Sequence, residues 1–323
     1  MHKFVLIAGS CGFIGSRLVQ RLSKKGLNLI CVDNCSNGKW ENLLDVDCIK
    51  IECDISDYSY LLNSLKDLNK TKEIKISEIW HLAANSDIQK GTEDINVDFA
   101  NTFETTLSLL KITKFFEVPA FRFASSSAVY GDYKDKAITE KDSICRPISN
   151  YGAMKLASEA VIFASKEAFL KDISIFRFPN VVGTPATHGV IFDFINKLKL
   201  NPDKLFVLGN GTQRKQYLYV EDLIDAMILV ANQKNNANYF DDDIYNIGPN
   251  DSGITVKEIA EMTIKYQSPN AQIIYGLDPQ GWVGDVPKFS YNTSKIRSLG
   301  WKEVFNSHQA VEKSVIEIKE QLK

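Results

Sequence analysis

The sequence lacks a strong excess of either charge. Its 323 residues carry 38 Lys and Arg against 40 Asp and Glu, which gives a formal net charge of −2. Surfaces that bind nucleic acids or anionic membranes are usually rich in Lys and Arg. We therefore expect neither a nucleic acid nor a membrane as a partner.

Long apolar runs are missing as well. The N-terminal run over residues 4–8 is too short for the hydrophobic region of a signal peptide. No other stretch approaches the ~20 apolar residues of a membrane span. We therefore expect a cytoplasmic protein in which residues 4–8 form a buried strand.

Clustered metal ligands are also scarce. The chain has only four histidines, and none of its six cysteines forms a Cys-x-x-Cys pair. A metal clip built from Cys31 and Cys35 is the alternative, but no second ligand pair accompanies them. We expect reduced thiols and no metal site.

What the sequence does contain is an alternation of apolar runs with amphipathic stretches. This alternation predicts an α/β fold with a doubly wound parallel sheet and helices on both faces. Ligands of such sheets bind at the carboxyl ends of the strands. Strands are expected at residues 4–8, 29–32, 48–53, 78–82, 120–124 and 173–178, and helices for example at 15–25 and 102–116.

Three glycines follow the first expected strand and open the first expected helix. Gly9 permits a tight turn, Gly12 lets the backbone approach a pyrophosphate, and Gly15 lets helix and strand pack closely. The N-terminus of the helix would stabilise the phosphate charge. The alternative for this Gly-x-x-Gly-x-x-Gly spacing is a purely structural turn.

Asp33 ends the second expected strand, 18 positions after Gly15. A carboxylate at this place accepts hydrogen bonds from both ribose hydroxyls and repels a 2′-phosphate. No arginine follows it directly. The sequence therefore predicts a Rossmann-type domain that binds NAD rather than NADP.

The rhythm of strands and helices loosens after residue 180. A helix is expected at 220–230, a solvated loop at 232–243, and a strand at 243–247 that returns to the main sheet. We expect a Rossmann domain over 1–180, with returns at 216–247. A smaller, interleaved C-terminal domain for the substrate is expected over 181–323.

Two further motifs carry acid–base chemistry. Tyr151 and Lys155 are four residues apart and share one helix face. An ammonium beside a phenol favours the phenolate and lowers the tyrosine pKa from about 10, which makes Tyr151 an acid or base for a hydroxyl. Three serines, Ser125, Ser126 and Ser127, directly follow a strand, where a serine can hydrogen-bond a reacting oxygen; an ordinary polar loop is the alternative.

Taken together, these motifs resemble the extended short-chain dehydrogenase/reductase family, in its nucleotide-sugar epimerase and dehydratase group, nearly end to end. The resemblance implies a catalytic set of Ser126, Tyr151 and Lys155, and a homodimer formed through helices at 102–116 and 151–166. The implied cofactor residues are Gly9, Gly12, Phe13, Ile14, Gly15, Asp33, Asn34, Asp54, Ile55, Leu82, Ala83, Ala84, Ser125, Tyr151, Lys155 and Pro179. The implied substrate residues are Ser127, Asn180, Val190, Lys215, Tyr217 and Trp282.

The sequence departs from the family in four places. Dehydratases of the group carry Asp-Glu where Ser127 and Ala128 stand. Either Thr102 or Asn101 replaces a family asparagine, either Arg214 or Lys215 meets the phosphate, and Trp282 either stacks on a base or packs in the core.

The missing carboxylates favour one reaction of the group. We expect NAD-dependent 4-epimerisation of a nucleotide-diphosphate sugar through a transient 4-keto sugar. The alternatives are 4,6-dehydration, reduction of a 4-keto sugar, or a non-catalytic NAD-binding sensor.

Overall fold

The computed structural model describes residues 2–133, 137–141, 144–235, 243–278 and 291–323. Contacts within the chain divide it into two compact units. Unit 1 comprises Met1–Val129, Pro147–Arg177 and Met227–Tyr245. Unit 2 comprises Tyr130–Arg146, Phe178–Ala226 and Asn246–Lys323. Both units are therefore assembled from segments that are distant in the sequence.

Unit 1 is built on a seven-stranded sheet with the order β11-β6-β5-β4-β1-β2-β3. All pairings from β3 to β6 are parallel. The chain moves outward in opposite directions from β1 and from β4, so the carboxyl ends of these neighbours form a topological switch point. The strands are β1 His2–Ala8, β2 Asn28–Asp33, β3 Ile49–Glu52, β4 Ile74–His81, β5 Ala120–Ala124, β6 Asp172–Arg177 and β11 Ile244–Asn246.

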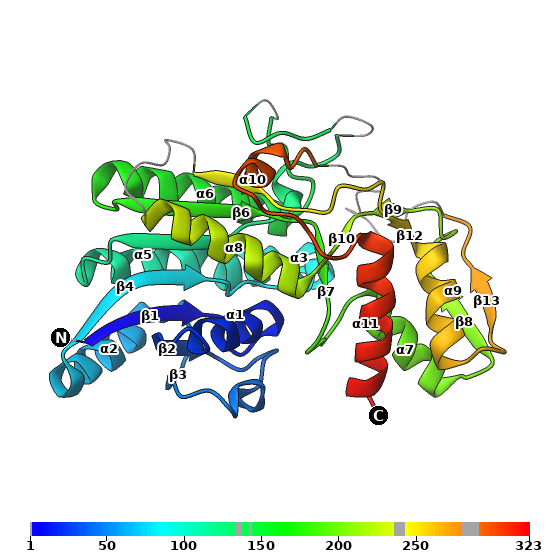
Figure 1. Cartoon of the computed structure of the whole chain (residues 1–323), viewed down its shortest axis with the longest axis horizontal. Helices are drawn as coiled ribbons and strands as arrows, with labels where there is room; N and C mark the ends of the chain where they lie inside the picture. Colours follow the sequence, from blue (N-terminus) through cyan, green and yellow to red (C-terminus); the bar gives the residue numbers. More distant parts are fainter. Residues whose placement is uncertain (1, 134–136, 142–143, 236–242, 279–290) are drawn as a thin grey trace. The chain divides into compact units, whose positions relative to one another are not determined.

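The strands appear in the sequence as uninterrupted apolar runs because helices cover both faces of the sheet. All five residues of β5 are buried, as are the last five of β1. Figure 1 shows helices flanking the sheet, and α2, α5 and α6 contribute side chains to its core. The longer helices are α1 Phe13–Ser23, α2 Tyr58–Lys72, α5 Thr105–Phe115, α6 Asn150–Ala168 and α8 Val220–Asn235.

The segment before α5 differs from the sequence prediction. Residues 102–104 do not belong to an α-helix but to a π-helical segment, η2 Phe99–Glu104. It follows the short helices α3 Ile88–Glu93 and α4 Ile95–Asp98. The wider π turn lets the chain pass from α4 into α5 without a break, a form often seen at functional sites.

The predicted loop at 232–243 is wrong in its first part. Residues up to Asn235 continue α8, because the buried stripe that includes Met227, Val230 and Ala231 extends the helix past its expected end. Residues 236–242 lie outside the described residues. The expected strand near 243–247 is confirmed as β11, which pairs with β6 in the main sheet.

Among its described residues, unit 2 contains three two-stranded sheets and a group of helices. Helices α7 Val190–Leu200, α9 Val256–Gln267 and α11 Ser307–Gln321 pack against one another, as Figure 1 shows. Both α9 and α11 begin with a capping box, formed by Thr255 with Glu258 and by Asn306 with Gln309. The strand pairs are β7 Asn180–Val182 with β10 Tyr217–Tyr219, β9 Arg214–Lys215 with β12 Ile254–Thr255, and β8 Lys204–Val207 with β13 Gln272–Tyr275.

Candidate active site

The glycine loop connects β1 to α1 and is closed by backbone contacts. Gly9 has φ +80°, and a Cβ on it would lie 2.6 Å from the Ala83 nitrogen. A Cβ on Gly15 would lie only 1.9 Å from the Gly9 carbonyl oxygen. Gly12 is different, because its Cβ would meet nothing nearer than that oxygen at 3.5 Å. Neighbouring backbone thus leaves no room for a side chain at Gly9 or Gly15, while the space beside Gly12 is open to a ligand.

Gly12 is also the N-cap of α1, and no side chain caps this end. The first N–H groups of Phe13 and Ile14 therefore have no intrahelical acceptor and are suited to phosphate oxygens. This arrangement fits a dinucleotide pyrophosphate.

Asp33 lies beside the loop and is fixed by it. Its Oδ2 accepts the Cys11 N–H at 2.8 Å, and its Oδ1 accepts the Cys35 N–H at 2.9 Å. The side chain is 7% exposed. Each carboxylate oxygen retains a lone pair, so the pair of oxygens can accept two ribose hydroxyls.

Two residues that support the loop were missed by the sequence analysis. A Cβ on Gly38 would lie 2.4 Å from the Cys11 carbonyl carbon, and the Asn42 Nδ2 donates to the Cys11 oxygen at 2.8 Å. Asn42 belongs to the short 3-10 helix η1 Trp40–Leu43. A glycine and an asparagine in the polar stretch after Asp33 were the available signal.

The remaining predicted cofactor residues of unit 1 follow β2, β3 and β4, at the same edge of the sheet as the loop. Asn34 Oδ1 accepts the Ser36 N–H, and Asp54 Oδ1 accepts both the N–H and the hydroxyl of Ser56. Ile55 is buried. Leu82, Ala83 and Ala84 continue from β4, where the Leu82 N–H donates to the Ala8 oxygen at 2.9 Å.

The predicted catalytic residues meet between β5 and α6. Ser149 caps α6 by accepting the Gly152 N–H at 3.1 Å. A Cβ on Gly152 would lie 2.4 Å from the Ala128 oxygen, so this glycine lets α6 approach the turn that follows Ser126. The Ser126 side chain lies close enough to the Tyr151 hydroxyl to favour its ionisation. The structure therefore brings Ser126 and Tyr151 together.

Lys155 lies one helical turn after Tyr151 and is almost fully buried. Its Nζ donates to the Ala124 oxygen at 2.6 Å and lies 5.7 Å from the centre of the Tyr151 ring. The ammonium is thus held by the last residue of β5, close to the phenol.

The predicted lowering of the Tyr151 pKa is wrong for this structure. Burial raises the pKa of Tyr151 to about 12, the Ser126 hydrogen bond opposes this rise, and the charge of Asp98 adds to it. Burial also lowers the pKa of Lys155 to about 7, against the carboxylates of Glu159 and Asp98. Desolvation is the largest cause of the pKa shift of each group.

Glu159 extends the same face of α6 by one more turn. Its carboxylate accepts the Ser125 hydroxyl in a short hydrogen bond and both the Nε (2.9 Å) and an Nη (2.5 Å) of Arg177. Ser125, a predicted cofactor residue, is therefore engaged by Glu159. Spaced four apart, Tyr151, Lys155 and Glu159 thus lie against three consecutive residues at the carboxyl end of β5, which are Ser126, Ala124 and Ser125 respectively.

We expect Arg177→Met to destabilise unit 1 strongly. Glu159 is 2% exposed, and removing its cation would leave a buried carboxylate without compensation. Breaking such a pair costs about 3–5 kcal/mol. Urea unfolding measures the effect. The control is Lys70→Gln, which removes the exposed pair with Asp67 and should cost less than about 1 kcal/mol; equal stability of the two variants would contradict the expectation.

Thr102, rather than Asn101, lies in the buried network beside β4. Thr102 is fully buried, and its Oγ1 accepts the Asn85 N–H at 3.2 Å. The Asn101 amide donates to the Val97 oxygen on its own helical segment. Of the two alternatives, the structure therefore places Thr102 next to the loop that follows β4.

The predicted substrate residues are divided between the units. Ser127 begins the turn η3 Ser127–Val129 in unit 1. Asn180 begins β7, Val190 begins α7, and Lys215 ends β9, all in unit 2. Of the other two predicted substrate residues, Tyr217 is buried in β10 of unit 2, and Trp282 lies outside the described residues. The predicted cofactor residue Pro179 also lies in unit 2.

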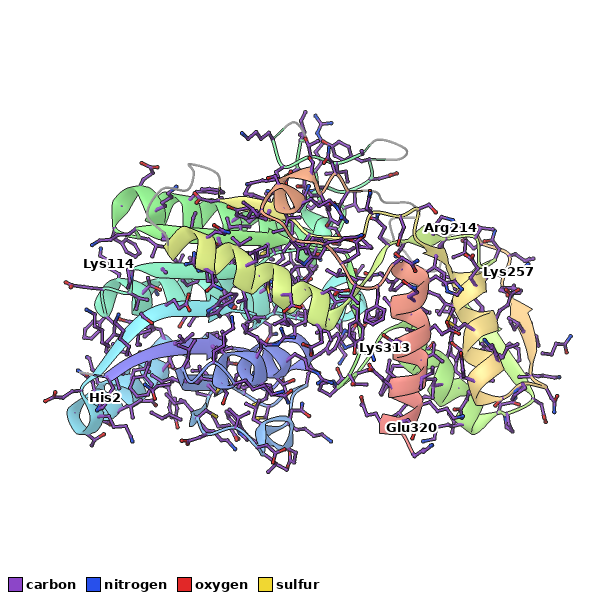
Figure 2. All side chains as sticks on the ribbon, viewed as in Figure 1. His2, Lys114, Arg214, Lys257, Lys313 and Glu320 are labelled. Atoms are coloured by element: carbon purple, nitrogen blue, oxygen red, sulfur yellow. The ribbon has the colours of Figure 1, made fainter. Side chains whose placement is uncertain are left out.

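Arg214, the alternative to Lys215, is tied to its own unit. Its guanidinium donates to the Gly253 oxygen at 2.8 Å and lies 3.5 Å from Glu258 at the start of α9. Figure 2 shows Arg214 at this end of unit 2, in the region of Lys257 on α9.

The described residues contain neither a membrane-spanning helix nor a metal-binding cluster. No helix in them is long and apolar enough to cross a membrane. In the same part of the chain, no group of three or more His, Cys, Asp or Glu side chains is arranged to hold a metal ion.

Comparisons with known proteins agree with this site. The chain is 31% identical to a UDP-galactose 4-epimerase of known structure, with a TM-score of 0.84 and coverage of 99% of this chain and 100% of the other. It is 28% identical to a UDP-glucose 4-epimerase from Lactobacillus helveticus, over 92% of this chain and 91% of the relative. It is also 26% identical to a dTDP-D-glucose 4,6-dehydratase from Dictyostelium discoideum, over 97% of this chain and 80% of the relative.

The profile of the NAD dependent epimerase/dehydratase family matches residues 5–248. This match spans the glycine loop, Asp33, Ser126, Tyr151 and Lys155. The chain belongs to the NAD dependent epimerase/dehydratase family, and its cofactor is NAD.

Proposed function

We propose that this protein is an epimerase that inverts C4 of a nucleotide-diphosphate sugar. The observation that carries the proposal is the contact of Tyr151 with Ser126, beside the buried Lys155 and at the strand edge that holds the glycine loop and Asp33. This edge combines an acid–base group with a dinucleotide cradle.

The glycine loop and Asp33 would hold NAD, which when bound supplies the acceptor and donor of the C4 hydride. Tyr151, as the phenolate, takes the proton of the sugar 4-hydroxyl, and Ser126 hydrogen-bonds the same oxygen. Lys155, as an ammonium, favours the phenolate. Tyr151 then returns the proton after the transient 4-keto sugar has presented its other face.

The dehydratase alternative is less well supported, although one relative is named as such an enzyme. Elimination of water needs an acid and a base beside the sugar. Ser127 and Ala128 provide no carboxylate after Ser126. A 4-keto reductase would consume reduced cofactor in stoichiometric amounts, and a non-catalytic sensor would not need the set of Ser126, Tyr151 and Lys155.

The nucleotide and the assembly are part of the same proposal. Two of the three relatives are named for UDP-sugars, so UDP-glucose and UDP-galactose are the first substrates to test. We further propose a cytoplasmic homodimer formed through α5 and α6, with unit 1 binding NAD and unit 2 contributing most of the contacts to the nucleotide sugar.

Incubation with UDP-, GDP-, CDP- and dTDP-sugars, followed by NMR of the anomeric protons, tests the proposal. We expect one sugar to be converted to an equilibrium mixture with its C4 epimer, without net reduction of NAD. Parallel incubations without protein control for chemical epimerisation. Loss of water from the sugar, or reduced cofactor consumed in proportion to product, would instead support one of the two alternatives.

A further inference from the structure

Asp98, at the end of α4, is a buried acid that the proposed chemistry does not use. It is 0% exposed, and its Oδ1 accepts a hydrogen bond from the Asn85 Nδ2 at 2.8 Å. Its Oδ2 lies against Gly91, where an added Cβ would be 1.9 Å away. Within the described residues, Oδ2 has no hydrogen-bond donor. A buried carboxylate in this condition requires a compensating charge.

The compensating positive charge lies on α6, on the side chain of Lys155. Both α4 and the π-helical segment η2 pack against α6, as does α3, which contains Gly91. Lys155 is 2% exposed, and it is the cation that acts electrostatically on Asp98. In the described parts of the chain, no Lys or Arg lies within ion-pair distance of Asp98. The two charges therefore interact across the packed helices without direct contact.

Two other ionisable groups, His81 and Glu159, also lie around Lys155. Burial keeps the pKa of His81, on β4, well below its usual value, so this side chain is neutral. Glu159, on α6 itself, acts more strongly than Asp98 on Lys155, but its carboxylate already forms a two-pronged ion pair with Arg177. Asp98 is thus the negative charge near Lys155 that no other cation neutralises in the described structure.

We propose that Asp98 is the buried counter-charge of Lys155, a positioning residue that keeps this side chain an ammonium ion beside Tyr151. The inference rests on the proposed function, because it concerns the acid–base pair of that site. The charge of Asp98 also opposes the ionisation of Tyr151, and Asp87 is the other acid whose charge acts on Asp98. Both actions of Asp98 move the working pH range of the pair upward.

The test compares Asp98→Asn with Asp94→Asn. Asp94 is an exposed acid on the N-cap of α4, four residues earlier, and asparagine preserves its capping role. Lysine side chains labelled with ¹³C are titrated by NMR, and the signal of Lys155, with its pKa of about 7, is identified by its loss in Lys155→Met.

We expect the titration midpoint of Lys155 to fall by about half a pH unit or more in Asp98→Asn, because an opposite charge is removed from its surroundings. In Asp94→Asn the midpoint should stay within about 0.2 unit, because solvent screens that charge. An unchanged midpoint in folded Asp98→Asn overturns the proposal.

A reciprocal measurement keeps the proposal testable if Asp98→Asn does not fold. In Lys155→Met, the carboxyl carbon of Asp98 should titrate at a pH higher by about half a unit or more, since its counter-charge is gone. The same Asp98 midpoint in Lys155→Met and in the unaltered protein would overturn the proposal.

The pH dependence of turnover provides the functional readout. Removal of the Asp98 charge lowers the pKa of both Lys155 and Tyr151, so Asp98→Asn shifts the whole pH profile of turnover toward acid. If the Lys155 midpoint moves but the pH profile of turnover does not, the proposed effect of Asp98 on the acid–base pair of Lys155 and Tyr151 is contradicted. The NMR titrations need no substrate, so a protein inactive on every sugar would refute the proposed function and leave these titrations decisive.

Discussion

Tyr151→Phe is expected to reduce kcat by about 10²–10⁴, the range attributed to a positioned general acid or base. The phenyl ring keeps the packing of the half-buried side chain and removes only the hydroxyl on which Ser126 acts. Affinity for NAD should change by less than about threefold, because the glycine loop and Asp33 are untouched. Steady-state kinetics on the epimerised sugar and calorimetric titration with NAD measure the two effects.

Tyr60→Phe is the matched control for this substitution. Tyr60 lies on α2 with 54% of its surface exposed, so loss of its hydroxyl should leave turnover unaltered. Full turnover in Tyr151→Phe would eliminate Tyr151 as the acid–base group and, with it, the mechanism proposed above.

Gly15→Ala is expected to abolish NAD binding and to lower the melting temperature. The new Cβ would stand 1.9 Å from the Gly9 carbonyl oxygen and 2.8 Å from its carbonyl carbon, so backbone has to move. Overpacking of this kind typically costs about 1–3 kcal/mol. It also displaces the loop from the start of α1. Thermal unfolding and calorimetric titration with NAD provide the two readouts.

Gly12→Ala separates binding from folding. Gly12 has φ −70°, which any residue adopts, and its Cβ would meet only the Gly9 oxygen at an ordinary 3.5 Å. We expect an unchanged melting temperature and a rise in the Kd for NAD of about tenfold or more, equivalent to about 1.4 kcal/mol. Unchanged affinity in Gly12→Ala would show that the pyrophosphate does not approach this glycine.

Much of unit 1 could be predicted because parallel strands buried on both faces appear as uninterrupted apolar runs. Residues 120–124 and 29–32 fall on β5 and β2, and even the late strand β11 is recognisable. The end of α8 and the π-helical segment before α5 were not predicted. Both depend on tertiary packing, which the local periodicity of the sequence does not report.

The candidate site, like the fold, could be predicted from the sequence only in part. Tyr151 and Lys155 could be paired from the sequence because their spacing fixes them on one helix face. Their pKa values could not be predicted from the sequence, because desolvation in the folded protein determines them. The sequence did not point to Asp98, Glu159 or Gly38, because each of them acts on a residue that only the fold brings near.

The order of the chain through its two units also has a genetic consequence. Unit 1 is encoded by three separated stretches, and its edge strand β11 is contributed long after β6. A single recombination event between two related genes cannot exchange such a unit whole, and a crossover near residue 180 would combine six strands of one parent with the seventh of another. Hybrid genes therefore inherit a working sheet only when β6 and β11 of the two parents are compatible.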